Sequence, residues 1–315
     1  MKIIKNILLL AAMAATVTLV SCGGGDDDGP VPTTPTDKTT PTGGDDSGIK
    51  GNVNANNTDD NRLLQRLEFP KVKGGNSIVI IHKTSTTVYD TDAVNYSVEW
   101  DADKKSQRWS CFVMKQGFGG NAKRSDSFME DPDLAAKYRF SSSQSYYSGS
   151  GFTRGHICAS ADRTFSDEAN QQTFYFTNMQ PQYYNFNGGS NYDGLWVQME
   201  NQVRNWVTKS KGDILYVVKG GTIDNTDQIL MRIKGEMIVP RYFYMAILCK
   251  NTLGYKALAF WAEHVTTTEP KADLGKHVIT IDELEKRTGI DFFCNLPDTE
   301  EEKVESKVAL NTWGL

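Results

Sequence analysis

The stretch that decides the fold begins with Thr153-Arg154-Gly155-His156 and continues through Thr177-Asn178-Met179-Gln180-Pro181-Gln182, Phe186-Asn187-Gly188-Gly189 and Trp196-Val197-Gln198-Met199-Glu200. Its last part has apolar residues at helical spacing, at Trp196, Met199, Val203 and Trp206. This spacing predicts an amphipathic helix with one buried face. The segment before that helix holds a histidine, asparagines and arginines close together, which is unusual outside a functional site.

On both sides of this stretch the chain predicts β-structure. We expect a buried strand over residues 77–83, a hairpin with arms at 96–100 and 109–113, and three further strands at 213–223, 242–250 and 256–262. Thr280 and Glu283 form a capping-box pattern that predicts a helix through Arg287, closed by Gly289. The strands and helices do not alternate regularly, so we predict an α+β domain with a mostly antiparallel central sheet flanked by helices.

Composition excludes several classes of protein. The chain has 315 residues, 39% of them hydrophobic, with 6 Trp, 13 Tyr and 14 Phe, which rules out a disordered or fibrous protein. The net charge is −5, but residues 1–22 carry +2 and residues 23–60 carry −6, so residues 61–315 carry only −1. A nearly neutral body neither supports nor excludes a nucleic-acid partner.

The N-terminus has the pattern of an exported protein. Lys2 and Lys5 precede an apolar run, and residues 1–21 therefore predict a signal peptide. Leu19-Val20-Ser21-Cys22 resembles a bacterial lipobox, which implies acylation of Cys22 and a lipid bilayer as partner; ordinary secretion with cleavage nearby is the alternative. We expect an acidic, Thr- and Pro-rich tether over 22–60 and a folded domain over 61–315, on a membrane-anchored lipoprotein facing the periplasm or the cell surface.

The remaining cysteines are Cys111, Cys158, Cys249 and Cys294. In an exported chain they could form disulfides, with three possible connectivities. Alternatively each is a small buried hydrophobe, since each has a bulky neighbour in the sequence.

Taken together, the motifs resemble the DNA/RNA non-specific endonucleases of the ββα-metal, or His-Me finger, class, which includes the Serratia nuclease and endonuclease G. The likeness extends over about residues 70–300, from Lys123-Arg124-Ser125 and Asp131-Pro132 upstream to Val239-Pro240 downstream. It implies a metal-dependent, sugar-non-specific endonuclease that cuts DNA or RNA phosphodiesters and leaves 5′-phosphates. It also implies Mg²⁺ as cofactor, with Mn²⁺ as a substitute, and gives no reason to expect a protein partner.

The resemblance assigns roles to particular residues. His156 would be the general base, because imidazole titrates near working pH. Arg124 would stabilise charge on the phosphate, and Glu200 would hold metal-bound waters. Asn178 would orient groups by hydrogen bonds, and Arg154 would be structural or would contact phosphate.

Asn187 would be the metal ligand, because it lies nine residues after Asn178. About five extra residues separate it from the helix, which leaves Asn191 as an alternative register. A second departure is Thr153, where the family commonly has aspartate; it removes a negative charge near His156. These two departures leave open a second reading, a nucleic-acid-binding surface lipoprotein with weak or no catalysis.

Overall fold

The computed structural model describes residues 52–59 and 61–315. Its strands are β1 (Ser77–Lys83), β2 (Val94–Asp101), β3 (Ser106–Met114), β4 (Thr153–His156), β5 (Met179–Gln182), β6 (Ile214–Gly221), β7 (Ile229–Ile233), β8 (Met237–Pro240), β9 (Tyr242–Asn251), β10 (Gly254–Glu263) and β11 (Val278–Ile279). Its α-helices are α1 (Ser143–Tyr147), α2 (Asp167–Gln172), α3 (Tyr184–Asn187), α4 (Leu195–Lys209), α5 (Ile281–Thr288) and α6 (Asp298–Glu305).

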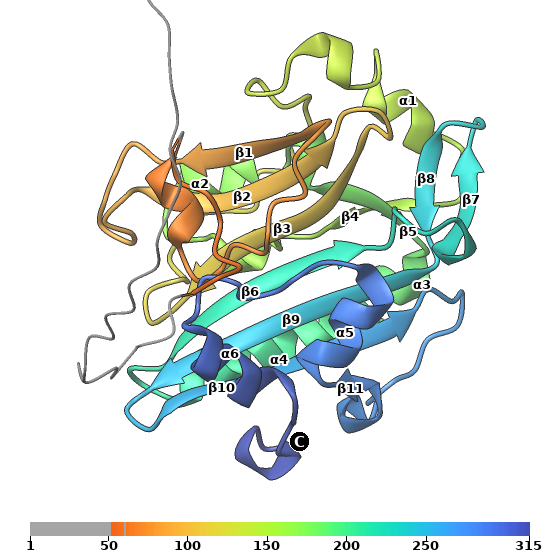
Figure 1. Cartoon of the computed structure of the whole chain (residues 1–315). Coiled ribbons are helices and arrows are strands. Elements are labelled where there is room, and N and C mark those ends of the chain that lie inside the picture. The colour runs from red at the N-terminus through yellow and green to blue at the C-terminus, as the bar shows by residue number, and fades with distance from the viewer. Residues whose placement is uncertain (1–51, 60) are drawn as a thin grey trace, which may run out of the picture. The chain divides into compact units, whose positions relative to one another are not determined.

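A seven-stranded sheet forms the centre of the fold, with the strand order β1-β2-β3-β6-β9-β10-β11. Every pairing in it is antiparallel. The strands expected from the sequence coincide with β1, β2, β3, β6, β9 and β10 to within a few residues. The α+β class with a mostly antiparallel sheet is therefore confirmed. Figure 1 shows the sheet with the hairpin of β7 and β8 beside it.

Both faces of this sheet are buried, and the alternation along β9 shows why. Phe243, Met245 and Ile247 belong to the core on one face, where α4 contributes Trp196 and Met199. Residues 244, 246 and 248 point the other way, into a second core that includes residues of α5 and α6. Successive side chains of a strand point to opposite faces, so one apolar strand serves both cores. In Figure 1, α4 lies behind β9 and β10, while α5 and α6 lie in front of them.

Helix α5 begins and ends where its sequence signals predict. The Thr280 hydroxyl accepts a hydrogen bond from the amide of Glu283 at 3.1 Å, which satisfies one free N–H of the first turn. Gly289 ends the helix in the left-handed conformation, with φ of 68°. In a complete capping box the Glu283 carboxylate would accept from the backbone amide of Thr280. Here it accepts from Arg287 at 2.8 Å and forms an ion pair.

The predicted boundary at residue 61 is wrong by several residues. Asn52 donates to the carbonyls of Cys294 and Leu296, and Asn54 donates to Glu301. Asn56 is buried and donates to the carbonyl of Pro70. These asparagines satisfy backbone and carboxylate acceptors of the C-terminal region, so the segment 52–59 belongs to the folded body despite its polar composition. The predicted signal peptide, Cys22 and most of the predicted tether lie outside the described residues.

The cysteine question is settled in favour of the second alternative. Cys111, Cys158, Cys249 and Cys294 are all buried and all have free thiols. Cys111 lies in the core shared with α5 and α6, and Cys158 and Cys249 lie in the core shared with α4. Among the described residues, none of the helices has the length and apolarity needed to cross a membrane.

Candidate active site

The ribbon of β4 and β5 carries the first two motifs. The strands are antiparallel, with His156 opposite Met179 and Thr153 opposite Gln182. Gly155 is required here, because a Cβ on this residue would lie 2.3 Å from the side chain of Gln182. The absence of a side chain at residue 155 therefore leaves room for the buried Gln182 side chain beside β4.

His156 is held by aromatic rings and by α4. The indole nitrogen of Trp196 donates to the His156 carbonyl at 3.1 Å, which ties the end of β4 to the start of the helix. The rings of Phe174 and Phe128 meet the imidazole edge to face, with centroids 4.8 and 5.9 Å away. The ring nitrogen Nε2 is buried and has no hydrogen-bond partner. The structure therefore orients the imidazole while leaving one of its nitrogens unengaged.

The charges around His156 keep the ring neutral. Burial lowers its pKa to about 3, and the cations of Arg124, Arg154 and Lys219 act in the same direction. The ring is therefore unprotonated near neutral pH, which is the form that a general base needs, and the same shift makes it a weaker base. Arg124 and Arg154 place positive charge beside it, which suits an anionic substrate.

The two arginines stand on the same aromatic residues that contact the imidazole. The Arg124 guanidinium lies over Phe174 at 4.9 Å, and the Arg154 guanidinium lies over Phe128 at 3.7 Å. Arg154 also donates to Gln144 at 2.8 Å, whereas the exposed Arg124 pairs only with the neighbouring Asp126, at 2.7 Å. The rings thus position both cations next to His156, and Arg124 keeps free donors toward solvent.

Asn187, the last residue of α3, is fixed to the strand that carries His156. Its side-chain nitrogen donates to the Thr153 hydroxyl at 3.0 Å, and that hydroxyl donates to the Gln182 carbonyl at 2.9 Å. Within residues 61–315 no donor reaches the amide oxygen of Asn187, which stays available as a hard ligand for a metal ion. Thr153 therefore contacts the amide of Asn187 and sets its orientation.

Asn191 is placed differently. It is exposed in the turn between α3 and α4 and makes no side-chain hydrogen bond to the described residues. The extra residues return the chain to α3, where Gly194 packs against the backbone of Phe186. A Cβ on Gly194 would lie 2.6 Å from the carbonyl oxygen of Phe186, which leaves no room for a larger residue. The structure thus brings Asn187, and not Asn191, to the β4–β5 ribbon.

Glu200 faces the interior and belongs to a buried ionic network. Its carboxylate lies 3.2 Å from the amino group of Lys219, which is also 3.4 Å from Asp162. Arg204 closes the network with a 2.7 Å contact to Asp162. Burial and the nearby Asp162 raise the pKa of Glu200 in spite of its two cationic neighbours.

Three members of this network were not predicted from the sequence as site residues: Asp162, Arg204 and Lys219. Two signals could have found them. Arg204 follows Glu200 by one helical turn, and Lys219 is a charged residue inside the apolar strand β6. A lysine on a buried strand needs a carboxylate partner, so its position alone predicts an ion pair.

Asn178 is fully buried and acts on the backbone. Its side chain donates to the carbonyls of Cys158 and Thr173 and accepts from the amide of Cys158, each at 2.8 Å. Ser110 supplies a fourth contact, at 3.2 Å. With its amide saturated, Asn178 holds the segment that follows His156 and is a positioning residue.

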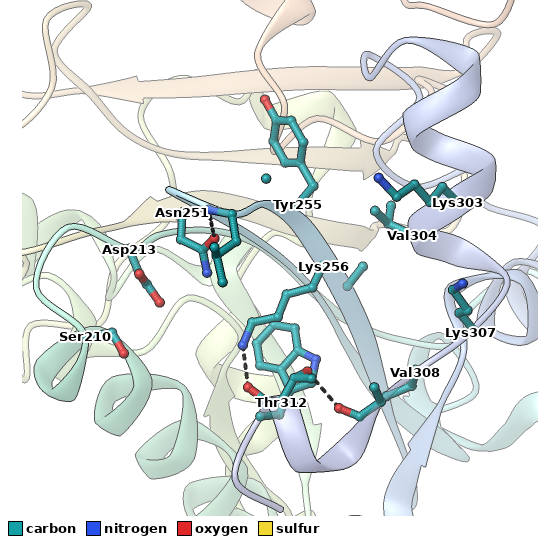
Figure 2. Close-up of a pocket in the computed structure, with 15 residues that line it drawn as sticks. Ser210, Asp213, Asn251, Tyr255, Lys256, Lys303, Val304, Lys307, Val308 and Thr312 are labelled. Atoms are coloured by element: carbon teal, nitrogen blue, oxygen red, sulfur yellow. Dashed lines mark hydrogen bonds between the residues drawn. The ribbon is translucent and has the colours of Figure 1, made fainter.

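A cavity of about 570 Å³ lies elsewhere, between the β9–β10 turn, α6 and the C-terminal segment. Figure 2 shows it with the side chain of Lys256 reaching the carbonyl of Thr312. None of the predicted site residues lines it. This cavity is therefore separate from the candidate active site.

Comparison with known proteins points to one family. The model of the DNA/RNA non-specific endonucleases matches residues 75–299. A nuclease from Nostoc is 31% identical over 222 residues, with 68% of this chain and 76% of the relative covered. The mitochondrial nuclease EXOG of Xenopus laevis is 30% identical over 215 residues, with 64% of this chain and 58% of the relative covered. Nuclease C1 of Cunninghamella echinulata is 31% identical over 193 residues, with 58% of this chain and 72% of the relative covered.

Among solved structures, the crystal structure of the EndoG/EndoGI complex matches with a TM-score of 0.56 at 18% identity, covering 71% of this chain and 89% of the other. At this identity the likeness concerns the fold alone. It agrees with the antiparallel sheet and flanking helices described above.

Proposed function

Because the chain belongs to the DNA/RNA non-specific endonuclease family, a family of metal-dependent nucleases, we propose that it is a sugar-non-specific endonuclease with His156 as its general base and Asn187 as its metal ligand. It would hydrolyse phosphodiester bonds of DNA, of RNA or of both, and leave 5′-phosphate and 3′-hydroxyl ends. The observation that carries this proposal is the imidazole of His156 held edge to face by Phe174 and Phe128, the same rings on which the guanidinium groups of Arg124 and Arg154 lie.

His156 would take a proton from the attacking water. As the water oxygen bonds to phosphorus, the bond from phosphorus to the 3′ oxygen breaks and the water proton moves to the imidazole. The leaving 3′ oxygen takes a proton from a second water molecule of the solvent and becomes the 3′-hydroxyl. This role needs a neutral imidazole, which burial and the neighbouring cations maintain. It also needs a fixed ring, which Trp196, Phe174 and Phe128 provide.

Arg124 and Arg154 would bind the phosphate. Their planar guanidinium groups match phosphate oxygens, and charge on those oxygens grows in the transition state. Arg124 is exposed and has donors to spare beyond its pair with Asp126. Contacts to phosphates carry little sequence information, so cleavage with loose base preference is expected.

Asn187 would hold Mg²⁺ through its amide oxygen, with Mn²⁺ as a substitute. Such an ion, when bound, neutralises charge on the phosphate and on the leaving oxygen. The fit rests on the hydrogen bond from the Asn187 amide nitrogen to Thr153, which leaves the oxygen as the free end of the amide. Glu200 would accept hydrogen bonds from water molecules bound to the ion. Its Oε1 contacts Lys219, so the second carboxylate oxygen would be the acceptor.

A plasmid-nicking assay tests the proposal. The full chain with Mg²⁺ is expected to convert supercoiled plasmid to open-circular and linear forms, and EDTA or His156→Ala is expected to abolish this. His277→Ala is the control, because this histidine lies away from the site and contacts Glu269. Products should be joined by DNA ligase without prior kinase treatment, since they would carry 5′-phosphates. Nicking that persists in both EDTA and His156→Ala would refute the mechanism.

The second candidate is a nucleic-acid-binding lipoprotein with weak or no catalysis. It is favoured by Thr153, which gives the motif a neutral hydroxyl in place of a carboxylate. The same experiment separates the two, because binding of plasmid in a gel-shift assay without nicking would support this candidate.

We also propose that the protein is exported and anchored by acylated Cys22. The support is the sequence Leu19-Val20-Ser21-Cys22 after an apolar run. Labelled palmitate supplied to expressing bacteria should appear in the wild type and be lost in Cys22→Ser.

A further inference from the structure

Three carboxylates meet where α5 and α6 lie side by side in front of the sheet (Figure 1). Asp282 and Glu285 come from α5, and Glu305 is the last residue of α6. One oxygen of each lies within 4.8 Å of an oxygen of the other two. Helix α4, which continues the His156 motif, lies on the opposite face of the sheet. This carboxylate cluster is therefore separate from the candidate active site.

The cluster contains a buried oxygen without a partner. Glu305 is only 6% exposed, and its Oε1 is buried and accepts no hydrogen bond. Among the described residues, no lysine, arginine or histidine lies within 4.0 Å of the three carboxylates. Glu285 uses one oxygen to accept from the amide of Phe292 at 2.7 Å and has a second oxygen to offer. An unpaired carboxylate at this depth carries a substantial desolvation cost.

Neighbouring groups add to the negative charge. Glu301 and Asp291 lie next to the cluster and share the side-chain amide of Asn54. Together with the three residues of the cluster, they bring five carboxyl groups into one region. Glu305 also stands at the C-terminal end of its helix, where the helix dipole disfavours a negative charge. Each of these effects would be reversed by a cation among the three carboxylates.

We propose that Asp282, Glu285 and Glu305 bind a divalent cation of the calcium class that fastens α6 to α5. The ligands are all oxygens, which hard cations require. Calcium accepts irregular sets of six to eight oxygens completed by waters, whereas Mg²⁺ demands a near-ideal octahedron. Three carboxylates contributed by two helices therefore suit calcium better.

Thermal unfolding of the full chain tests this proposal. All proteins carry Asn187→Ala, so that an ion at the candidate active site does not contribute to the result. The Tm is measured first in EDTA and then with Ca²⁺ in excess over the EDTA. At a free calcium concentration a hundred times the Kd, the Asn187→Ala protein should have a Tm about 5–10 °C higher than in EDTA. Adding Glu305→Gln should abolish the gain, whereas adding Glu302→Gln, an exposed residue of the same helix, should preserve it.

Glu305→Gln is expected to fold, because glutamine has nearly the same shape as the glutamate side chain and adds no charge to the interior. Should it fail to fold, Asp282→Asn combined with Glu285→Gln serves the same purpose. Isothermal titration calorimetry should show one calcium site that these variants lack. The proposal is overturned if calcium causes no shift, or if Glu305→Gln shifts as much as its parent. Nuclease activity measured in the wild-type background should be the same with and without Glu305→Gln, so either proposal can fail alone.

Discussion

The region around His156 and the carboxylate cluster at α5 and α6 are electrostatic opposites. In the first, a partly buried base lies near the cations of Arg124, Arg154 and Lys219, and its pKa falls to about 3. In the second, a buried acid is surrounded by carboxylates, and the pKa of Glu305 rises to about 10. In both, burial and like charges suppress the charged form.

What differs is what each region can attract. The cationic region suits a phosphate, and its neutral imidazole can take a proton from water. The acidic region suits a metal ion and offers no group for chemistry on a phosphate. The comparison teaches that a buried group without a counter-ion indicates a binding site, and that the sign of the surrounding charge indicates its ligand.

The largest expected effect concerns Asn187. Asn187→Ala should lower the rate of plasmid cleavage by at least about 10³-fold, because the metal ion stabilises charge in the transition state by several kcal/mol. Asn191→Ala is the control and should retain activity close to wild type. Initial rates at saturating Mg²⁺ measure both.

An inactive Asn191→Ala next to an active Asn187→Ala would show that the metal register is wrong. The region around His156 would then have no metal ligand on α3, and its comparison with the carboxylate cluster would no longer hold.

The next effect concerns Lys219, the buried cation that serves the cationic region. Lys219→Met should destabilise the fold by about 3 kcal/mol, since it leaves Glu200 and Asp162 with one cation fewer in the interior. Urea denaturation followed by tryptophan fluorescence measures this change. Lys209→Met, on an exposed position of the same helix as Glu200, should change stability by less than about 0.5 kcal/mol.

If the two lysine variants are equally stable, the ionic network of Lys219 does not support the site, and its burial must be balanced by other contacts.

The last effect is a change in the pH dependence of stability in EDTA. The folded pKa of His156 is about 3 and lies below the ordinary value of 6.5, so the unfolded chain takes up the proton first. This contribution to stability is fully present above pH 6.5 and is lost as the pH falls toward 3. His156→Gln should therefore lose less stability on acidification than the wild type.

Urea midpoints measured between pH 7 and pH 4 test this slope, with His277→Gln as the control. A wild-type curve as flat as that of His156→Gln would mean that the imidazole is accessible to protons in the fold.

Much of the fold could be predicted because its strands are long and apolar. β1, β6, β9 and β10 each contain enough Val, Ile, Leu and aromatic residues to be recognised alone. Helix α5 was predicted from its cap at Thr280 and its glycine stop. The short elements β4, β5 and α3 have too few residues for a periodic pattern, and only the motifs located them. Helix α6 is rich in acidic residues and has little apolar signal.

The candidate site was predicted in part. His156, Asn187 and Glu200 were proposed from the spacing of the motifs. This spacing can be recognised in the sequence because each residue has a defined position on β4, α3 or α4. Lys219 was missed, because its partners are 57 and 19 residues away and no local pattern links them. Asn178 was expected to orient site groups or the loop by hydrogen bonds, and its amide is bonded to the backbone of Cys158 and Thr173.

The sequence by itself determined the family, the strand and helix segments and the residues that carry the proposed chemistry, because these depend on local spacing and on the alternation of apolar side chains. Tertiary structure alone decided which charged groups are buried together. It placed Asn187 against Thr153 of β4, left the four described cysteines unpaired, drew residues 52–59 into the fold and brought the carboxylates of α5 and α6 into one cluster. Such outcomes depend on contacts between segments far apart in the chain, where packing fixes each distance and each pKa.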